Sequence, residues 1–338
     1  MNIIKKLLLT VVVLPFAVST CFANTSINLF FHDLDDPFFY FQVAKQIKAS
    51  ANTYNVEVTL FNGHLDKQRQ INQINDNSGF GRQSIVTATT KDVAQAAVNA
   101  AKDNDAQIIF FNIKPSNALL DSYDNAWFVG GNPRVSAMEQ IRLVGDYLDL
   151  NRDTADRNGN RRIDFIFLRG MESDEDSKIR TQLAYEFLNN QEFDLNPISS
   201  NSSNWSLEAA YKDVKNTLKT THPKDIDIIV SNNDAMALGA IKALNEVGYN
   251  LPNGADNKYI PIFGIDGIRE AIKAVQTRQM AGTVYVDKTS IARACIMLAK
   301  ETGITSEEAE KLLQKKIKHK SVYIPFLKIA NFKQYPLD

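Results

Sequence analysis

Planar polar side chains follow five apolar runs in this sequence, and the runs lie in both halves of the chain. In chain order, these side chains are Asp36, Asn112, Asp174 with Asp176 and Arg180, Asn232 with Asn233 and Asp234, and Asp266. Open α/β sheets bind ligands at the carboxyl ends of their strands. Each residue alone would be an ordinary helix cap or turn residue. The recurrence in both halves therefore indicates a binding site.

The types of these residues suit a polyol. Carboxylates and amides each engage two hydroxyls at once, and an arginine offers a planar fork of donors. An aromatic ring would cover the apolar C–H face of a sugar. Phe38 and Trp205 are the candidates, and Trp205 is favoured because it stands in the polar stretch NSSNWS. The alternative for Trp205 is packing on the flank of a lobe.

Apolar runs that alternate with helical patterns must position these residues. The alternation runs from SINLFF to QIIFFN, restarts after Pro133 and continues to YIPIFGID. Such βαβ order predicts parallel sheets covered by helices on both faces. The sequence therefore predicts an α/β fold with two successive lobes of similar build.

Length and charge narrow the function classes. A chain of 338 residues with 44% hydrophobic content is sufficient for one large or two medium domains. A formal net charge of -1 without a sustained basic run argues against nucleic acid as a partner.

The N-terminus has the pattern of an export signal over residues 1–23. Two lysines precede the run LLLTVVVLPFAV, and small residues lead to Ala23, where cleavage is expected. A lipoprotein anchored at Cys21 is the alternative, but a threonine precedes that cysteine. Removal of the signal would leave Cys295 as the single cysteine, so no intramolecular disulfide is expected.

Several motifs resemble the periplasmic galactose/glucose-binding proteins of bacterial sugar importers. They are HDLDDPF, FFNIKPS, FLRG with Asp176 and Arg180 beyond it, SNNDAMALGAIKAL, IPIFGID and MAGTV, in the order of that family. The resemblance implies a type I periplasmic binding protein, with two doubly wound parallel-sheet lobes joined by a three-crossing hinge. It implies an N-terminal lobe of residues 24–132 plus 287–322, and a C-terminal lobe of residues 133–286 plus 323–338.

The resemblance also implies which residues contact the sugar. They are Asp36, Phe38, Asn112, Asp176, Arg180, Trp205, Asn233 and Asp266. In this interpretation Asn233 bonds sugar hydroxyls, while Asp234 caps the following helix or orients its neighbours.

Three positions depart from the family pattern. Asp174 replaces a histidine, Val286 replaces an asparagine, and Lys114 replaces an acidic residue. Val286 would leave a facing hydroxyl unpaired, and Asp174 would add a buried negative charge that requires compensation. Lys114 could pair with Asp174, or the ligand could carry a positive charge, as an amino sugar does. Alternatively, Asp174 points to solvent and Asp287 turns inward in place of Val286.

A second candidate site lies in the loop DRNGNRRID. Its side chains follow the spacing of an EF-hand loop at positions one, three, five and nine, with Asp156, Asn158, Asn160 and Asp164. The carbonyl of Arg162 would be the seventh-position ligand, and the resemblance adds Asp227 as a distant carboxylate. Arg161 stands where the sharp turn favours glycine. The loop predicts a structural calcium site, with a plain polar turn as the alternative.

The expected function is that of an exported, monomeric receptor in the periplasm. It would bind a galactose- or glucose-like monosaccharide and deliver it to an ABC permease in the inner membrane, with a chemoreceptor as a second candidate partner. The alternative is a sugar-acting enzyme that uses Asp174 and Asp176 as paired carboxylates. Two residues apart, however, these side chains would point in different directions. A transcription regulator of the same fold would need a DNA-binding segment where the export signal lies.

Overall fold

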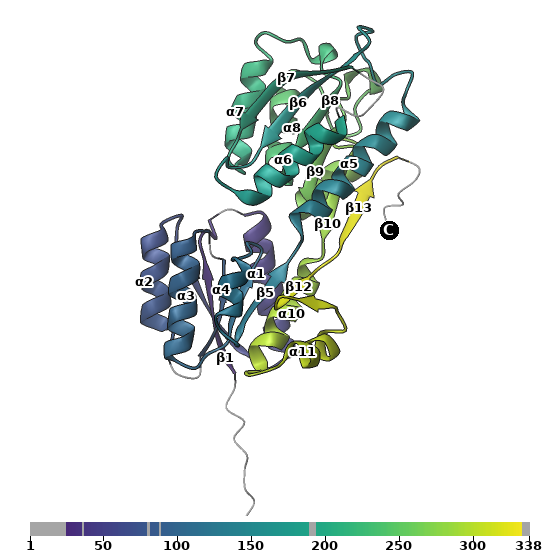
Figure 1. Ribbon diagram of the computed structural model, residues 1–338. Coiled ribbons are helices and arrows are strands. Elements are labelled where there is room, and N and C mark those ends of the chain that lie inside the picture. Colours follow the sequence, from purple (N-terminus) through teal and green to yellow (C-terminus); the bar gives the residue numbers. More distant parts are fainter. Residues whose placement is uncertain (1–24, 36, 80–81, 88, 189–193, 333–338) are drawn as a thin grey trace, which may run out of the picture.

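Two β-sheets organise the described part of the chain (Figure 1). The computed structural model describes residues 25–35, 37–79, 82–87, 89–188 and 194–332. The expected export signal and the candidate Asp36 lie outside these residues.

The first lobe is built on a seven-stranded sheet with the order β11-β12-β5-β4-β3-β1-β2. Its strands are β1 (Ser26–Phe31), β2 (Glu57–Asn62), β3 (Arg82–Val86), β4 (Ile108–Phe111), β5 (Ala126–Gly130), β11 (Ile317–Lys318) and β12 (Ser321–Tyr323). Its helices are α1 (Phe39–Thr53), α2 (Lys67–Asn77), α3 (Lys91–Asp103), α4 (Asn117–Asp121), α10 (Lys288–Lys300) and α11 (Ser306–Leu313).

The second lobe is built on a six-stranded sheet with the order β13-β10-β9-β8-β6-β7. Its strands are β6 (Arg162–Arg169), β7 (Asp194–Ser202), β8 (Ile228–Ser231), β9 (Ile262–Asp266), β10 (Gly282–Val286) and β13 (Phe326–Ala330). Its helices are α5 (Pro133–Leu150), α6 (Glu175–Leu188), α7 (Leu207–Thr217), α8 (Asp234–Glu246) and α9 (Arg269–Gln276).

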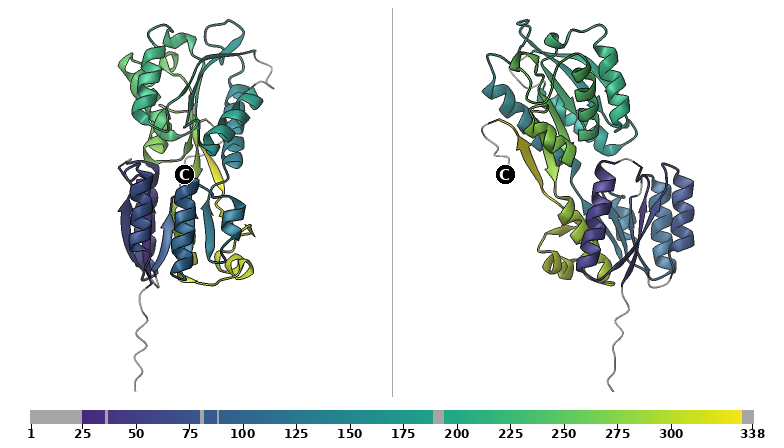
Figure 2. Two further views of the ribbon diagram at one scale, coloured as in Figure 1. Left: turned by 60° about the vertical axis from the view of Figure 1, so that its left-hand side comes forward. Right: turned by 180° about the vertical axis from the view of Figure 1, so that it is seen from behind.

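Both sheets are covered on both faces, because each central strand is apolar on both sides. In β1, Leu29 and Phe31 enter the core shared with α1 and α10, whereas Phe30 enters the core shared with α2 and α3. In β6, Ile166 packs with α7, α8 and α9, and Phe167 packs with α5. Figure 2 shows helices on opposite faces of the first sheet. The alternation of side chains along a strand explains this division.

The predicted doubly wound architecture is confirmed. In each lobe the first strand has the second on one side and the third on the other, so the order reverses between β1 and β3 and between β6 and β8. Such reversals are where open α/β sheets bind ligands. The sheets are mixed rather than purely parallel, because β11 pairs antiparallel with β12 and β13 pairs antiparallel with β10.

The chain passes between the lobes at three places. These are residues 131–132 between β5 and α5, residue 287 between β10 and α10, and residues 324–325 between β12 and β13. Because β5 and β10 both end at crossings, the carboxyl edges of the two sheets face each other (Figure 1). Among the described helices, none combines the length and apolarity needed to cross a lipid bilayer.

Candidate functional site between the lobes

The described ligand candidates of the two lobes gather at these facing edges. In the first lobe, Asn112 follows β4 and Phe38 immediately precedes α1. In the second lobe, the candidates come after β6, β7 and β8 and at the last residue of β9, and they are Asp174, Asp176, Arg180, Trp205, Asn233 and Asp266. We refer to these residues together as the interlobe site.

Arg180 is the central cation of the interlobe site. Its side chain projects from α6 and is buried, and Nη1 donates to the carbonyl of Asn232 at 2.6 Å. Nη2 lies 3.9 Å from Asp176 Oδ2, and the guanidinium lies 5.6 Å from the centroid of the Trp205 ring. The Nε of Arg180 is buried without a hydrogen-bond partner among the described residues. The guanidinium is thus fixed in place, and its Nε is left without a partner among the described residues.

Asp174 faces the interlobe site. Its Oδ2 accepts a hydrogen bond from Trp205 Nε1 at 3.1 Å, and its Oδ1 accepts from the backbone N–H of Asp176 at 2.9 Å. Trp205 can lie over this loop because residue 170 is glycine, where a Cβ would overlap the indole ring. The expectation that Asp174 points to solvent is therefore wrong.

Asp176 carries a perturbed carboxyl group in the first turn of α6. Burial raises its pKa to about 6, while Arg180 opposes the shift and the neighbouring carboxylates Asp174 and Glu175 add to it. Removing a carboxylate from water disfavours its ionised form. Asp176 therefore changes charge close to neutral pH.

Tyr40 connects the first lobe to these charges. Its hydroxyl accepts a hydrogen bond from Asn112 Nδ2 at 3.0 Å, and its ring packs edge-on against His32. Burial raises the pKa of Tyr40, and the negative charges of three second-lobe carboxylates, Asp174, Asp176 and Asp266, raise it further. Phe38 also reaches across and packs against the core of the second lobe that contains Ile166. Groups from both lobes therefore share one electrostatic environment.

Asn233 rather than Asp234 caps α8, and Asp234 has the alternative role expected for it, that of orienting its neighbours. Asn233 caps α8, since its Oδ1 accepts from Met236 N at 2.9 Å while its Nδ2 donates to the Trp205 carbonyl at 3.2 Å. Asp234 is buried and does not cap the helix. It accepts from Ile268 N at 2.9 Å and from Thr283 Oγ1 at 2.6 Å, which orients the strands beside it. Burial and the charge of Asp266 raise the pKa of Asp234 to about 8.

Neither Val286 nor Asp287 presents a polar group to the interlobe site. Val286 is buried in the core of the first lobe, so the hypothesis that it faces a ligand hydroxyl is wrong. Asp287 caps α10, with Oδ1 accepting from the N–H groups of Thr289 and Ser290 and Oδ2 accepting from the Ser290 hydroxyl. Its carboxylate is directed at the helix rather than turned inward. Neither side chain therefore takes over the polar role of the family asparagine.

The expected partner of Asp174 is engaged elsewhere. Lys114 Nζ donates to Asn117 Oδ1, at the start of α4. Burial lowers the pKa of Lys114, and the charge acting on it comes from Asp121. Lys114 thus does not compensate Asp174.

Two further residues belong to this environment, and motif comparison missed both. One is Tyr40, which lies on the helix after the HDLDDPF motif. The other is Lys288, whose Nζ donates to the carbonyls of Asp266 and Gly267. A lysine directly after a helix-capping aspartate is a usual surface residue, so nothing in the sequence marked it as buried.

The loop expected to bind calcium forms a closed hydrogen-bonded turn. Asp156 accepts from backbone N–H groups of the loop, and Asp227 accepts from the N–H groups of Arg157 and Asp164, both at 2.7 Å. The side-chain N–H groups of Asn158 and Asn160 donate to Asp164 Oδ2 at 2.8 and 2.7 Å.

The donor chemistry of this loop fits calcium only after a local rearrangement. Among the described residues, no group of three His, Cys, Asp or Glu side chains is arranged to hold a metal ion. Carboxylates and amide oxygens are the ligands that calcium prefers. Rotation of the Asn158 and Asn160 amides would turn their oxygens toward Asp164. Arg161 already has the left-handed φ of +66° that the sixth position requires.

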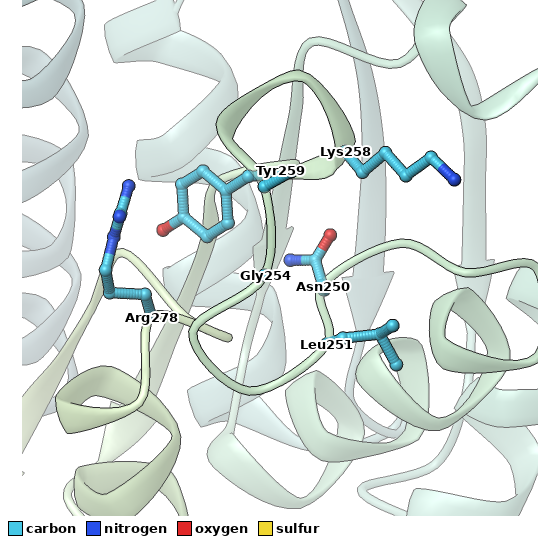
Figure 3. A pocket seen from close by; sticks show the side chains of 7 residues that line it. Asn250, Leu251, Gly254, Lys258, Tyr259 and Arg278 are labelled. Carbon is cyan, nitrogen blue, oxygen red and sulfur yellow. The ribbon is translucent and has the colours of Figure 1, made fainter.

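A separate shallow pocket lies on the second lobe (Figure 3). It is lined by Asn250, Leu251, Gly254, Ala255, Lys258, Tyr259 and Arg278. These residues precede β9 and β10 in the chain, so the pocket lies at the amino edge of the sheet. It is therefore not part of the interlobe site.

Comparison with known proteins identifies the family. Residues 27–303 match the model described as "Periplasmic binding protein domain". The D-galactose/methyl-galactoside binding periplasmic protein MglB of Haemophilus influenzae is 29% identical over 236 residues, which cover 69% of this chain and 67% of that protein. The D-apiose import binding protein of Actinobacillus succinogenes is 25% identical over 326 residues, 91% of this chain and 93% of that protein.

Solved structures show the same fold. An ABC transporter periplasmic solute binding protein from Actinobacillus succinogenes with bound D-allose has a TM-score of 0.70 at 18% identity, covering 91% of this chain and 98% of that chain. A myo-inositol-bound solute binding protein from Bacillus halodurans has a TM-score of 0.67 at 21% identity, with 91% and 95% coverage. Since the family model covers most of its length, the chain belongs to the periplasmic binding protein family.

Proposed function

We propose that the protein is an exported periplasmic receptor that captures a monosaccharide between its lobes and delivers it to an ABC importer in the inner membrane. The observation that carries this proposal is the environment of Arg180. Asp176 and the Trp205 ring flank the guanidinium. From the other lobe, Tyr40 is hydrogen-bonded to Asn112 and lies within the influence of the second-lobe carboxylates, Asp176 included. A buried donor without a partner costs about 1 to 3 kcal/mol. A sugar hydroxyl that accepts from Arg180 Nε would remove this penalty.

The relatives support a sugar as the ligand class. Their names include binders of D-galactose, D-xylose and D-apiose. We propose a galactose- or glucose-like hexose, because the described contact residues of the galactose/glucose-binding type are retained. The periplasm is the proposed location and an ABC permease the proposed partner, with a chemoreceptor as a second one. We expect the receptor to act as a monomer.

Asp174 favours an amino sugar as the alternative ligand. Its carboxylate lies beside Asp176, and Lys114 is bonded to Asn117 instead of pairing with it. An ammonium group on the sugar would supply the missing positive charge. A pentose is a further alternative.

A sugar-acting enzyme is the less favoured alternative. Asp174 and Asp176 lie in one turn, where Asp174 accepts the backbone N–H of Asp176. Glycosidases place two carboxylates on either side of the scissile bond, which one short turn does not provide. The relatives are named as binding and import proteins.

A calorimetric screen tests the ligand class. Purified protein is titrated with D-galactose, D-glucose, D-xylose and D-galactosamine, and the sugar is recovered afterwards for analysis. We expect saturable binding of at least one sugar, which is released unaltered. Chemical conversion of the sugar would favour the enzyme, and absence of binding to all four would contradict the proposal. Preference for D-galactosamine over D-galactose would assign the charge-compensating role to the ligand.

Tryptophan emission locates the bound sugar. A stacked sugar displaces water from the indole face of Trp205. Trp127 is buried in the core of the first lobe, so its emission should not respond. We expect Trp205→Phe to abolish the emission change that the bound sugar causes. Retention of the full change in this variant would remove Trp205 from the site.

A further inference from the structure

Lys288 is a buried lysine at the second crossing between the lobes. It is the first residue of α10, whose core contacts are in the first lobe, and only 6% of its surface is exposed. Lysine is almost never buried to this degree unless its charge is paired. Its burial therefore requires specific partners.

The hydrogen-bond partners of Lys288 lie in the second lobe. Its Nζ donates to the carbonyls of Asp266 at 2.7 Å and Gly267 at 3.1 Å, where the chain turns at the end of β9. The ammonium also lies 5.5 Å from the ring centroid of Phe39 and 5.2 Å from that of Tyr285. Both distances permit cation–π attraction. One side chain thus connects α1, α10 and the turn at residues 266–267.

The turn at residues 266–267 has an unfavourable backbone conformation. Asp266 has a φ of +118°, which non-glycine residues rarely adopt, and Gly267 has a φ of +58°. A Cβ at position 267 would lie 2.6 Å from the Cα of Tyr285, so the turn is pressed against β10. Such conformations persist only when surrounding contacts enforce them. The two hydrogen bonds from Lys288 are contacts of this kind.

The surroundings of Lys288 are acidic. The carboxylates of Asp266, Asp234, Asp287 and Glu270 all act on its ammonium. Glu270 also takes part in a second contact between the lobes, because Gln42 Nε2 of α1 donates to Glu270 Oε2 at 2.9 Å. Lys288 therefore lies among the contacts between the first lobe and the start of α9.

We propose that Lys288 is a positioning residue that holds the turn at residues 266–267 against the first lobe, aims the Asp266 side chain into the interlobe site and sets the angle between the lobes. The part of this proposal that concerns Asp266 rests on the proposed sugar-binding function. The part that concerns the lobe angle does not.

Small-angle scattering of the sugar-free protein tests the lobe angle. Lys288→Met removes the charge and both hydrogen bonds but keeps an unbranched side chain. Lys300→Met is the matched control, because Lys300 ends the same helix and donates to the Tyr54 carbonyl at 3.2 Å within the first lobe. We expect a larger radius of gyration for Lys288→Met and an unchanged one for Lys300→Met.

A second variant keeps the test decisive if Lys288→Met does not fold. Lys288→Gln keeps an N–H donor and should shift the radius of gyration in the same direction by a smaller amount. Circular dichroism and thermal melting establish that each variant is folded. If every folded Lys288 variant scatters like the unmodified protein, Lys288 does not set the lobe angle.

A double-mutant cycle with D-galactose tests the action through Asp266. We expect Lys288→Met to weaken D-galactose binding tenfold or more in the unmodified background, but less than twofold in an Asp266→Ala background. Equal weakening in both backgrounds would show that Lys288 does not act through Asp266. Unchanged binding by Asp266→Ala alone would instead contradict the proposed ligand contact. The scattering experiment remains decisive for the lobe angle in either case, and also if D-galactose does not bind.

Discussion

Asp176 shows how a residue suited to ligand binding acts against the stability of the fold. Its pKa is raised to about 6 by burial, despite the opposing charge of Arg180. A carboxyl group with a higher pKa in the folded than in the unfolded chain destabilises the fold wherever it is ionised. The penalty is therefore complete above about pH 6, and it disappears as the pH falls toward the ordinary aspartate pKa near 4. A role of Asp176 in ligand binding would explain why the protein has a carboxylate that destabilises its fold.

The first prediction follows from the destabilising effect of the ionised Asp176 carboxylate. Asp176→Asn should raise the melting temperature of the sugar-free protein at pH 7.5, and the gain should shrink to nothing near pH 4. Thermal melts across this range measure it. Asp153→Asn, at an exposed position in the turn after α5, is the control and should show no such trend. A gain that does not depend on pH would mean that Asp176 is not a destabilising carboxylate.

The second prediction concerns binding. Asp176→Ala and Arg180→Ala should each weaken sugar binding by about 2 to 5 kcal/mol, because each change leaves the partner charge uncompensated. Calorimetry measures the loss. Arg142→Ala, which removes the exposed Arg142–Glu139 pair at 2.6 Å, should bind normally. Near-native affinity in both site variants would contradict the assignment of these residues.

Residue types in order along the chain were sufficient to predict which strand ends carry polar groups, but not where each side chain points. Asn233 rather than Asp234 caps α8, and Val286 lies in the core. The direction of a side chain depends on the hydrogen bonds that the neighbouring strands offer. These are long-range contacts, such as that between Asp234 and Thr283. Tyr40 and Lys288 were missed for the same reason.

At the scale of elements, apolar strands were predictable and polar edge strands were not. SINLFF matches β1, because both faces of that strand are buried and four of its six residues are apolar. β7 was not predicted, because its sequence, DLNPISSNS, is polar and contains Pro197. Proline is tolerated there because β7 is the last strand of its sheet. The antiparallel strand β13 was missed because it lies far along the chain from its partner β10.

The third prediction concerns the loop between α5 and β6. Calcium should raise the melting temperature, because an ion that binds only the folded state stabilises it by mass action. Removal by a chelator should reverse the effect, and Asp156→Ala should abolish it. We expect Asn257→Ala, outside the loop, to respond as the unmodified protein does. A melting curve that calcium and chelator leave unchanged would identify the loop as a hydrogen-bonded polar turn.

At the scale of the whole molecule, the first five strands of each lobe have the same order, but the two lobes contribute unequally to the interlobe site. The second lobe supplies Arg180, Trp205 and the described carboxylates, whereas the first supplies Phe38 and Asn112 with Tyr40. Two such unequal surfaces favour initial capture by the second lobe and completion of the contacts by the first. The crossings allow this, because each contains few residues between two regular elements.

The last prediction follows from this division of contacts. If one sugar bridges both lobes, D-galactose at saturating concentration should slow amide hydrogen exchange in both. The affected segments should be the starts of α6 and α8 in the second lobe and the segment after β4 in the first. Mass action predicts a gain of about 2.7 kcal/mol in the free energy of unfolding at a concentration of one hundred times Kd. Protection confined to the second lobe would show that the sugar binds there without drawing in the first, and the role proposed for Asn112 would then be wrong.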